Sequence, residues 1–148
     1  MAVIDIARTE VETTTPDTPV AEVVRKLHRT AVSGLVVVDG KEPVGLVTGR
    51  NLTMALLDDD LNAETTPVEG FVDGEIPTVP ADAGIYETLE TLTERGARRV
   101  FVVDEGELAG LVSISDIVLL LGTELQQVAN AIRSSSPAFR REGVYYRE

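Results

Sequence analysis

One half of this sequence repeats the other without a gap. Residues 3–55 align with residues 68–120 at a constant offset of 65 positions, so that Val37-Val38-Asp39 falls on Val102-Val103-Asp104. A repeat of this length predicts two copies of one supersecondary unit that bury their hydrophobic faces against each other. We therefore divide the chain into a first repeat at 1–57, a linker at 58–67, a second repeat at 68–132 and a tail at 133–148.

Each copy shows the same order of hydrophobic patterns. A short strand is predicted at 10–14 and at 75–79, followed by a helix with apolar residues at helical spacing from Val20 to Leu27 and from Ile85 to Leu92. Two β-rich runs then predict a hairpin, at 35–47 and at 100–112, and a last helix begins at Arg50 or Ser115. The predicted fold class is mixed α/β (α+β), with two β-α-β-β-α repeats packed as a pseudo-two-fold pair.

Composition restricts the classes of function. The 148 residues carry a formal net charge of −12 and no cysteine, which excludes disulfides, thiolate zinc sites and thiol nucleophiles. The acidic balance weighs against nucleic acid as a partner, because its phosphates are bound mainly by lysine and arginine. No apolar run reaches the length of a membrane span, and the cytoplasm is the expected location. The many carboxylates are typical of salt-adapted proteins or, alternatively, of simple acidic solubility.

The segments after each hairpin carry the candidate chemistry. Gly45-Leu46-Val47-Thr48-Gly49-Arg50-Asn51 and Gly110-Leu111-Val112-Ser113-Ile114-Ser115-Asp116 share a glycine, two apolar residues, a hydroxyl and a polar group three positions on. The hydroxyl lies where a strand leads into a helix, and free backbone N–H groups there favour oxygen-rich ligands. A carboxylate at Asp116 can accept two hydrogen bonds from neighbouring hydroxyls, such as those of a ribose. The alternative is that hydroxyl and acid only cap the helix.

Motif, hairpin and repeat together resemble the CBS (cystathionine β-synthase) domain, and the arrangement resembles a tandem pair over about residues 3–121. The resemblance implies a non-enzymatic module that senses an adenosine-containing ligand, such as AMP, ADP, ATP or S-adenosylmethionine, and requires no other cofactor. It also implies a homodimer that regulates a separate, unidentified protein.

In the resemblance, each cleft joins the motif of one copy to the first strand of the other. The stronger predicted site comprises Leu111, Ser113 and Asp116 with Val11 and Glu12, and has Ser33 and Gly34 at its edge. The second predicted site comprises Leu46, Thr48 and Asn51 with Ile76 and Pro77. Since Asn51 replaces the acid of the family pattern, we expect this second site to be the weaker one or to be empty.

Charged residues near the motifs suggest which ligand would bind. Arg98 and Arg99 open a strand where the family often places cations facing phosphates, and Arg50 lies inside the first motif. Surface charge pairing is the alternative role for these arginines. Glu12 favours the opposite conclusion, because its carboxylate would repel a phosphate and tolerate a cationic sulfonium.

Catalysis and metal binding find little support in the sequence. The single histidine, His28, is expected to be exposed on the first helix, and it has no nucleophile to activate. Asp58-Asp59-Asp60 lacks the alternating spacing of a calcium loop and is read as a solvated part of the linker. A rival to the sensor is therefore a structural dimerisation module with vestigial clefts.

The C-terminal part suggests contacts with other molecules. The helix from Ser115 holds more apolar residues than one sheet face needs, which predicts burial in a homodimer or under the tail; they are Ile117, Val118, Leu119, Leu120, Leu121 and Leu125. The tail has four arginines against two glutamates over residues 131–148 and is read either as a frayed terminus or as a contact for an acidic partner, a second copy or nucleic acid.

Overall fold

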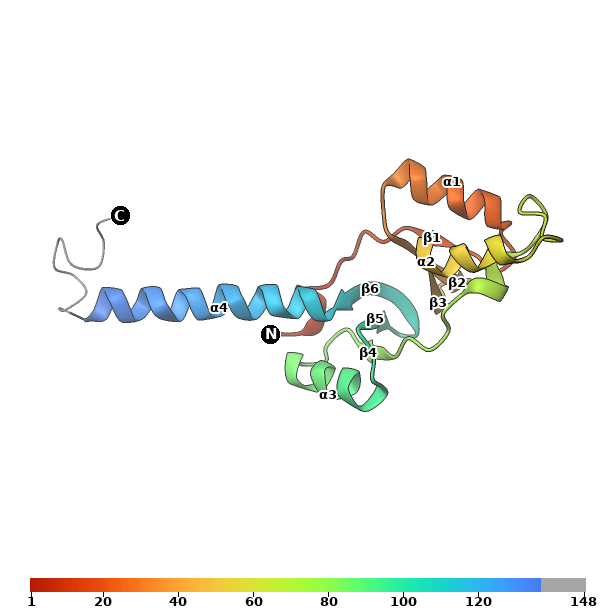
Figure 1. Ribbon diagram of the computed structural model, residues 1–148. Coiled ribbons are helices and arrows are strands. Elements are labelled where there is room, and N and C mark those ends of the chain that lie inside the picture. The colour runs from red at the N-terminus through yellow and green to blue at the C-terminus, as the bar shows by residue number, and fades with distance from the viewer. Residues whose placement is uncertain (137–148) are drawn as a thin grey trace, which may run out of the picture. The chain divides into compact units, whose positions relative to one another are not determined.

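The computed structural model describes residues 1–136 of the chain and divides into two units, Met1–Ser113 and Ile114–Glu148. The first unit contains two three-stranded sheets with their helices, and the second contains one long helix, α4 (Ile114–Ser135) (Figure 1). From residue 137 onward the arginine-rich tail lies outside the described residues, so its predicted contacts remain predictions.

The two sheets have the same topology. The strands of the first are β1 (Thr13–Thr14), β2 (Gly34–Asp39) and β3 (Glu42–Thr48). Those of the second are β4 (Thr78–Pro80), β5 (Arg99–Asp104) and β6 (Glu107–Ser113). In each sheet the first strand pairs parallel with the second and the second pairs antiparallel with the third, with a register shift at matching positions of the two hairpins. The predicted mixed α/β class with two hairpins is confirmed.

One helix covers each sheet. Helix α1 (Val20–Thr30) lies beside the first sheet and α3 (Ile85–Arg95) beside the second, and they bury Val23 and Leu92 respectively (Figure 1). Both helices end on a residue in the left-handed conformation, which is Ala31 (φ 54°) in the first repeat and Gly96 (φ 57°) in the second. The helices predicted from apolar spacing are therefore present in both repeats.

The last helix differs greatly between the repeats. In place of one predicted helix at 50–57, the first repeat has a four-residue helix, α2 (Gly49–Leu52), followed by a 3-10 helix, η2 (Thr53–Leu57). The Thr53 hydroxyl bonds back to the Arg50 carbonyl at 2.6 Å, and the i→i+3 pattern tightens the chain before it enters the linker. In the second repeat, α4 continues for 22 residues. No described helix is long and apolar enough to cross a membrane.

The segment before each first strand packs on the opposite repeat. The 3-10 helix η1 (Val3–Asp5) bonds to the start of the α3 region, from the Val3 N–H to the Ala83 carbonyl at 2.7 Å. The matching 3-10 helix η3 (Val68–Phe71) bonds to the start of the α1 region, from the Val68 N–H to the Thr18 carbonyl at 2.8 Å. Both valines are fully buried, so each repeat completes its core with a segment from the other.

Candidate functional site

The glycine of each motif makes room for a chain segment from the other repeat. Leu46 and Asp73 exchange two backbone hydrogen bonds of 2.9 Å, and Arg8 and Leu111 exchange two of 3.0 Å. A Cβ atom on Gly45 would lie 2.7 Å from the Asp73 carbonyl oxygen. We call the segments 7–8 and 72–73 the crossing segments. The motif glycines are thus explained by this close backbone approach, without reference to a ligand.

The same arrangement holds at the other motif glycine with slightly more room. A Cβ atom on Gly110 would lie 2.9 Å from the Ala7 Cβ and 3.0 Å from the Arg8 carbonyl oxygen. Arg8 and Asp73 occupy matching positions of the repeat, yet they carry opposite charges and both are exposed. Sequence reasoning missed both residues, although the constant offset pairs them.

In the first motif, Thr48 and Asn51 bond to each other. The Asn51 Oδ1 accepts from the Thr48 backbone N–H at 2.9 Å and from the Thr48 hydroxyl at 2.8 Å, and the Asn51 N–H donates to the Thr48 hydroxyl oxygen at 3.3 Å. This reciprocal pattern is a capping box for α2. Thr48 and Asn51 therefore cap α2, and the Asn51 Oδ1 already has two donors. Their predicted part in a ligand site stays a prediction.

The second motif has the same spacing with different neighbours. Ser113 is the last residue of β6, and Asp116 lies in the first turn of α4; both are half-buried. In the β5–β6 ladder Ser113 stands opposite Arg99, whereas Thr48 stands opposite Gly34 in the β2–β3 ladder. A cationic residue thus neighbours the second motif where the first has no side chain.

Gly34 lies close to the first motif. A Cβ atom at Gly34 would be 3.1 Å from the Thr48 Cγ2 and 3.6 Å from the Leu46 Cδ1. Its place at the edge of the Ser113 site stays a prediction, as does that of the preceding Ser33, which is exposed. Of the predicted cations, Arg50 and Arg98 are exposed and Arg99 is half-buried.

The predicted apolar residues of both sites come together in one core cluster between the sheets. Its buried members are Val36, Leu46 and Phe101. Val11, Ile76 and Leu111 are partly buried and pack against them. Sequence reasoning missed Phe101, which occupies the position of Val36 in the second repeat. An aromatic residue replacing valine at a fully buried strand position was the available signal.

The Glu12 carboxylate lies close to the ammonium group of Lys26. The Lys26 Nζ lies 3.7 Å from the Glu12 Oε2 and also donates to the Thr13 carbonyl. The backbone carbonyls of Glu12 and of its repeat partner Pro77 accept from Val36 and Phe101 at 3.0 and 2.9 Å. Lys26 offsets the negative charge that would otherwise repel a phosphate, which weakens the argument for a sulfonium ligand.

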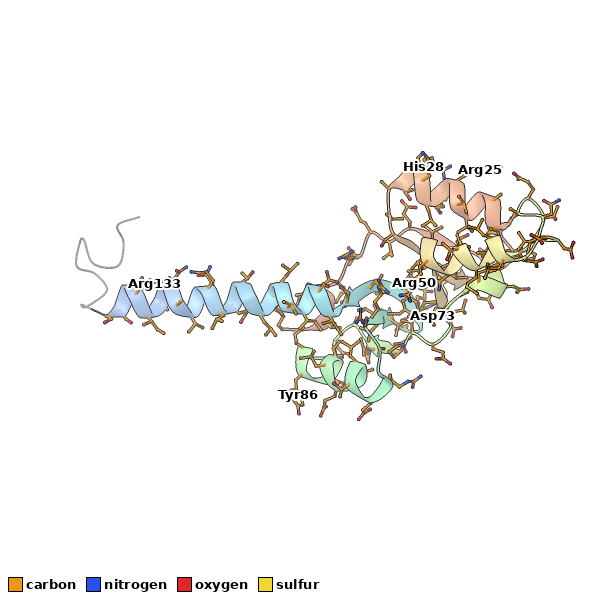
Figure 2. The ribbon with its side chains drawn as sticks, viewed as in Figure 1. Arg25, His28, Arg50, Asp73, Tyr86 and Arg133 are labelled. Atoms are coloured by element: carbon orange, nitrogen blue, oxygen red, sulfur yellow. The ribbon has the colours of Figure 1, made fainter. Side chains whose placement is uncertain are left out.

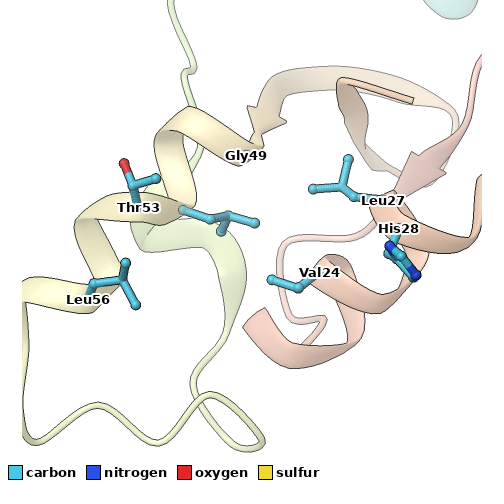
Figure 3. A pocket seen from close by; sticks show the side chains of 7 residues that line it. Val24, Leu27, His28, Gly49, Thr53 and Leu56 are labelled. Carbon is cyan, nitrogen blue, oxygen red and sulfur yellow. The ribbon is translucent and has the colours of Figure 1, made fainter. Parts of the chain in front are cut away.

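A hollow of about 440 Å³ lies between α1 and the α2–η2 segment, and Gly49 of the first motif is among the residues that line it (Figure 3). Its wall is mostly apolar and includes Val24, Leu27, Leu52 and Leu56. His28 also lines it and is exposed, as predicted (Figure 2). Among residues 1–136, no group of three or more histidine, cysteine, aspartate or glutamate side chains is placed to hold a metal ion.

Comparison with protein families gives one match on each repeat. The CBS domain model matches residues 3–58 and residues 68–122. A protein of Methanopyrus kandleri, described only as uncharacterised, is 28% identical over 120 residues, which are 80% of this chain and 61% of that protein. The inosine-5′-monophosphate dehydrogenase of Thermoplasma acidophilum is 32% identical over 111 residues, which are 74% of this chain but 21% of the enzyme.

Solved structures give the same result for the fold. A conserved CBS domain protein of unknown function from Thermoplasma acidophilum superposes with a TM-score of 0.64 at 27% identity, over 80% of this chain and 67% of that one. The CBS domain pair of another protein, solved with 5′-methylthioadenosine and S-adenosyl-L-methionine, superposes with a TM-score of 0.67 at 21% identity, over 84% of this chain and 98% of that one.

Proposed function

The chain belongs to the CBS domain family, with one domain in each repeat, and from this premise we propose that it is a non-enzymatic module that binds an adenosine-containing ligand and regulates a separate protein. CBS pairs bind such ligands as regulatory modules, and one structural relative was solved with two of them. The chain spans 61% of the Methanopyrus protein and 21% of the dehydrogenase, so their further domains are not carried over.

The observation that carries this proposal is the hydroxyl and acid pair at Ser113 and Asp116. Ser113 ends a strand, Asp116 lies in the first turn of the following helix, and Arg99 stands opposite Ser113 in the sheet. A carboxylate at this position suits the two hydroxyls of a ribose, since charge-assisted hydrogen bonds are the stronger kind. We assign ribose recognition to Asp116 and adenine contact to Val11 and Leu111.

The charged residues favour a phosphate-bearing ligand of the AMP, ADP or ATP type over S-adenosylmethionine. Arg98 and Arg99 supply cations at the start of β5. The first repeat contributes one acid to the predicted Ser113 site, Glu12, and the Lys26 Nζ lies 3.7 Å from its Oε2. In a chain of net charge −12, such local cations are required to offset the surrounding negative field.

Regulation would follow from linkage between ligand and partner. A ligand that favours one arrangement of the repeats, and a partner that prefers the same arrangement, are coupled by typically 1–3 kcal/mol. The crossing segments supply a physical route, because each joins the first part of one repeat to the third strand of the other. A ligand held at one motif therefore acts on backbone from both repeats.

Calorimetry on the full chain in high salt, with AMP, ATP and S-adenosylmethionine in turn, tests the proposal. Asp116→Ala removes a charge-assisted hydrogen bond and should weaken the tighter binding event by about 1.5–3 kcal/mol, roughly tenfold to a hundredfold. Asn51→Ala is the matched control and should leave that event unchanged. Equal affinity in the parent and in Asp116→Ala would show that Asp116 does not bind the ribose.

A second candidate function is a dimerisation module with vestigial clefts. The observation that favours it is the capping box at Thr48 and Asn51, in which the two motif residues bond to each other. In this alternative none of the three ligands gives heat above dilution, and Asp116→Ala changes only the stability of the chain.

A further inference from the structure

The two crossing segments carry opposite charges at matching positions. Arg8 and Leu111 exchange two backbone hydrogen bonds of 3.0 Å, and Asp73 and Leu46 exchange two of 2.9 Å, each pair forming an antiparallel bridge. Residues that stand directly opposite each other in an antiparallel bridge project their side chains from the same face of the sheet. Arg8 therefore lies on the face of Leu111, and Asp73 lies on the face of Leu46.

These two faces also carry the candidate ligand residues. Leu46 and Leu111 are both predicted ligand residues, and both pack in the core cluster between the sheets. Thr48 is two residues beyond Leu46 in β3, and Ser113 is two residues beyond Leu111 in β6. Because side chains alternate along a strand, each hydroxyl faces the same way as its leucine. Leucine, hydroxyl and crossing residue thus share one face in each repeat.

The charge on this face differs between the repeats. In the second repeat Arg99 stands opposite the motif hydroxyl in the β5–β6 ladder and adds a second cation to Arg8. In the first repeat Gly34 stands opposite the motif hydroxyl and adds no charge to Asp73. Arg8 and Asp73 are exposed and Arg99 is half-buried. A ligand held at the second motif therefore meets positive charge on the sheet, and a ligand held at the first motif meets negative charge.

The Asp73 carboxylate is oriented by its own segment. Its Oδ1 accepts a hydrogen bond from the Glu75 N–H at 3.1 Å, as in an Asx turn. Glu75 is acidic too, but its counterpart Glu10 gives the other crossing segment the same charge, so this pair does not distinguish the two motifs. Arg50 belongs to the first motif and lies on α2 rather than on the sheet. The charge difference on the sheet face thus comes from the crossing residues and Arg99.

We propose that Arg8 and Asp73 give the two motif sites different ligand selectivity. At the second motif the Arg8 guanidinium, together with Arg99, selects an adenosine-containing ligand that carries phosphates, because guanidinium groups bind phosphate oxygens well. At the first motif the Asp73 carboxylate repels phosphates and admits an adenosine-containing ligand that has none. The inference rests on the proposed function, since it takes both motifs to bind adenosine-containing ligands, and it names the class that each one takes.

Calorimetry on the full chain in moderate salt, with ADP and 5′-methylthioadenosine as the two probes, tests the selectivity. The parent should bind one ADP per chain. The ADP-saturated protein should still bind 5′-methylthioadenosine, because the phosphate-free probe then occupies the first-motif site. Competition of the two probes for a single site, or two ADP molecules bound per parent chain, would overturn the proposal.

Arg8→Gln tests the second-motif site. It should weaken ADP binding by about fivefold and leave the affinity for 5′-methylthioadenosine unchanged, since that probe has no phosphate. Arg95→Gln is the matched control, because it removes the same charge from an exposed position on α3, which carries no predicted ligand residue. It should change neither affinity. Equal losses for both probes in Arg8→Gln would show that Arg8 acts through the fold and would overturn its role in selectivity.

Asp73→Arg tests the first-motif site by a gain of binding, since the variant should take up a second ADP per chain. Glu90→Arg makes the same change of charge at an exposed position of α3 and should still bind one ADP. Asp73→Asn keeps the oxygen that accepts from the Glu75 N–H and guards against misfolding of the arginine variant. It should raise the affinity of ADP for the first motif by about fivefold. One ADP per chain in both Asp73 variants would overturn the proposal.

The outcomes separate this inference from the proposed function. If neither probe gives heat above dilution, adenosine-ligand binding is refuted and the selectivity is refuted with it. If both probes bind and the variants at Arg8 and Asp73 leave their affinities unchanged, the proposed function stands and the selectivity by the crossing segments is refuted.

Discussion

The two repeats share a fold down to the register shift in their hairpins, and they differ where each motif enters its helix. The first repeat ends in four residues of α-helix capped by Thr48 and Asn51, with Gly34 opposite the threonine. The second ends in 22 residues of helix with Asp116 in the first turn and Arg99 opposite the serine. The features common to both, such as the motif glycines Gly45 and Gly110, are those that the packing requires. Two of the differences place a charged residue at the second motif where the first has a neutral one, Asp116 for Asn51 and Arg99 for Gly34, and this is where we expect ligand binding to differ.

The largest expected effect comes from the two motif glycines. Gly45→Ala forces a Cβ against the Val72 side chain and to within 2.7 Å of a backbone oxygen, and should lower the free energy of unfolding by about 3 kcal/mol. Gly110→Ala meets its neighbours at 2.9 and 3.0 Å and should cost about 1–2 kcal/mol. Urea unfolding followed by circular dichroism measures both.

Gly74→Ala is the control for these variants. Its Cβ would lie 3.7 Å from the Val44 carbonyl oxygen, an ordinary contact, and its stability should stay within about 0.5 kcal/mol of the parent. If Gly45→Ala were as stable as Gly74→Ala, the crossing segment at 72–73 would not approach β3 as closely as described.

The next largest expected effect is on ligand binding and concerns the difference between Asn51 and Asp116 at matching positions of the two motifs. Asn51→Asp keeps the oxygen that accepts from Thr48 and replaces the amide nitrogen with a second carboxylate oxygen, so the cap of α2 should survive. Binding at the first-repeat motif should then strengthen by about fivefold to tenfold, as a charged acceptor replaces a neutral amide. Calorimetry should show the change in the weaker of two events, without any change in the stronger. Two equal sites in the parent would remove the basis of this comparison.

The smallest expected effect is on stability and comes from the residues that end α1 and α3, Ala31 and Gly96. Ala31 holds a left-handed conformation that costs an L-residue about 1–2 kcal/mol, partly offset by the greater freedom of glycine in the unfolded chain. Ala31→Gly should therefore stabilise the protein by about 0.5–1 kcal/mol. Gly96→Ala should destabilise it by a similar amount, because a Cβ there meets nothing within 4 Å and only the backbone is affected. Thermal unfolding of both variants checks the opposite signs; two shifts of the same sign would contradict the prediction.

The secondary structure was predictable because it depends on local patterns. The apolar spacing of α1 and α3 and the two hairpins follow from residues a few positions apart. The partners of Leu46 and Leu111 were not predictable in this way, since a backbone hydrogen bond to Asp73 or Arg8 leaves no mark on hydrophobic periodicity. The pairing of Lys26 with Glu12 likewise depends on side-chain geometry, whereas capping of α2 was the alternative that the motif spacing itself suggested. The motif residues themselves were found from the repeat, and their binding roles remain predictions.

The crossing segments also affect the order in which the chain can fold. Asp73 meets Leu46 soon after it along the sequence, so this crossing can form once the first half has been synthesised. Arg8 meets Leu111 across most of the described chain, and contacts between such distant residues close the largest loops and form late. The N-terminal segment that completes the second repeat therefore stays unpaired on the ribosome until β6 has emerged. We expect this last closure to set the folding rate of the whole chain.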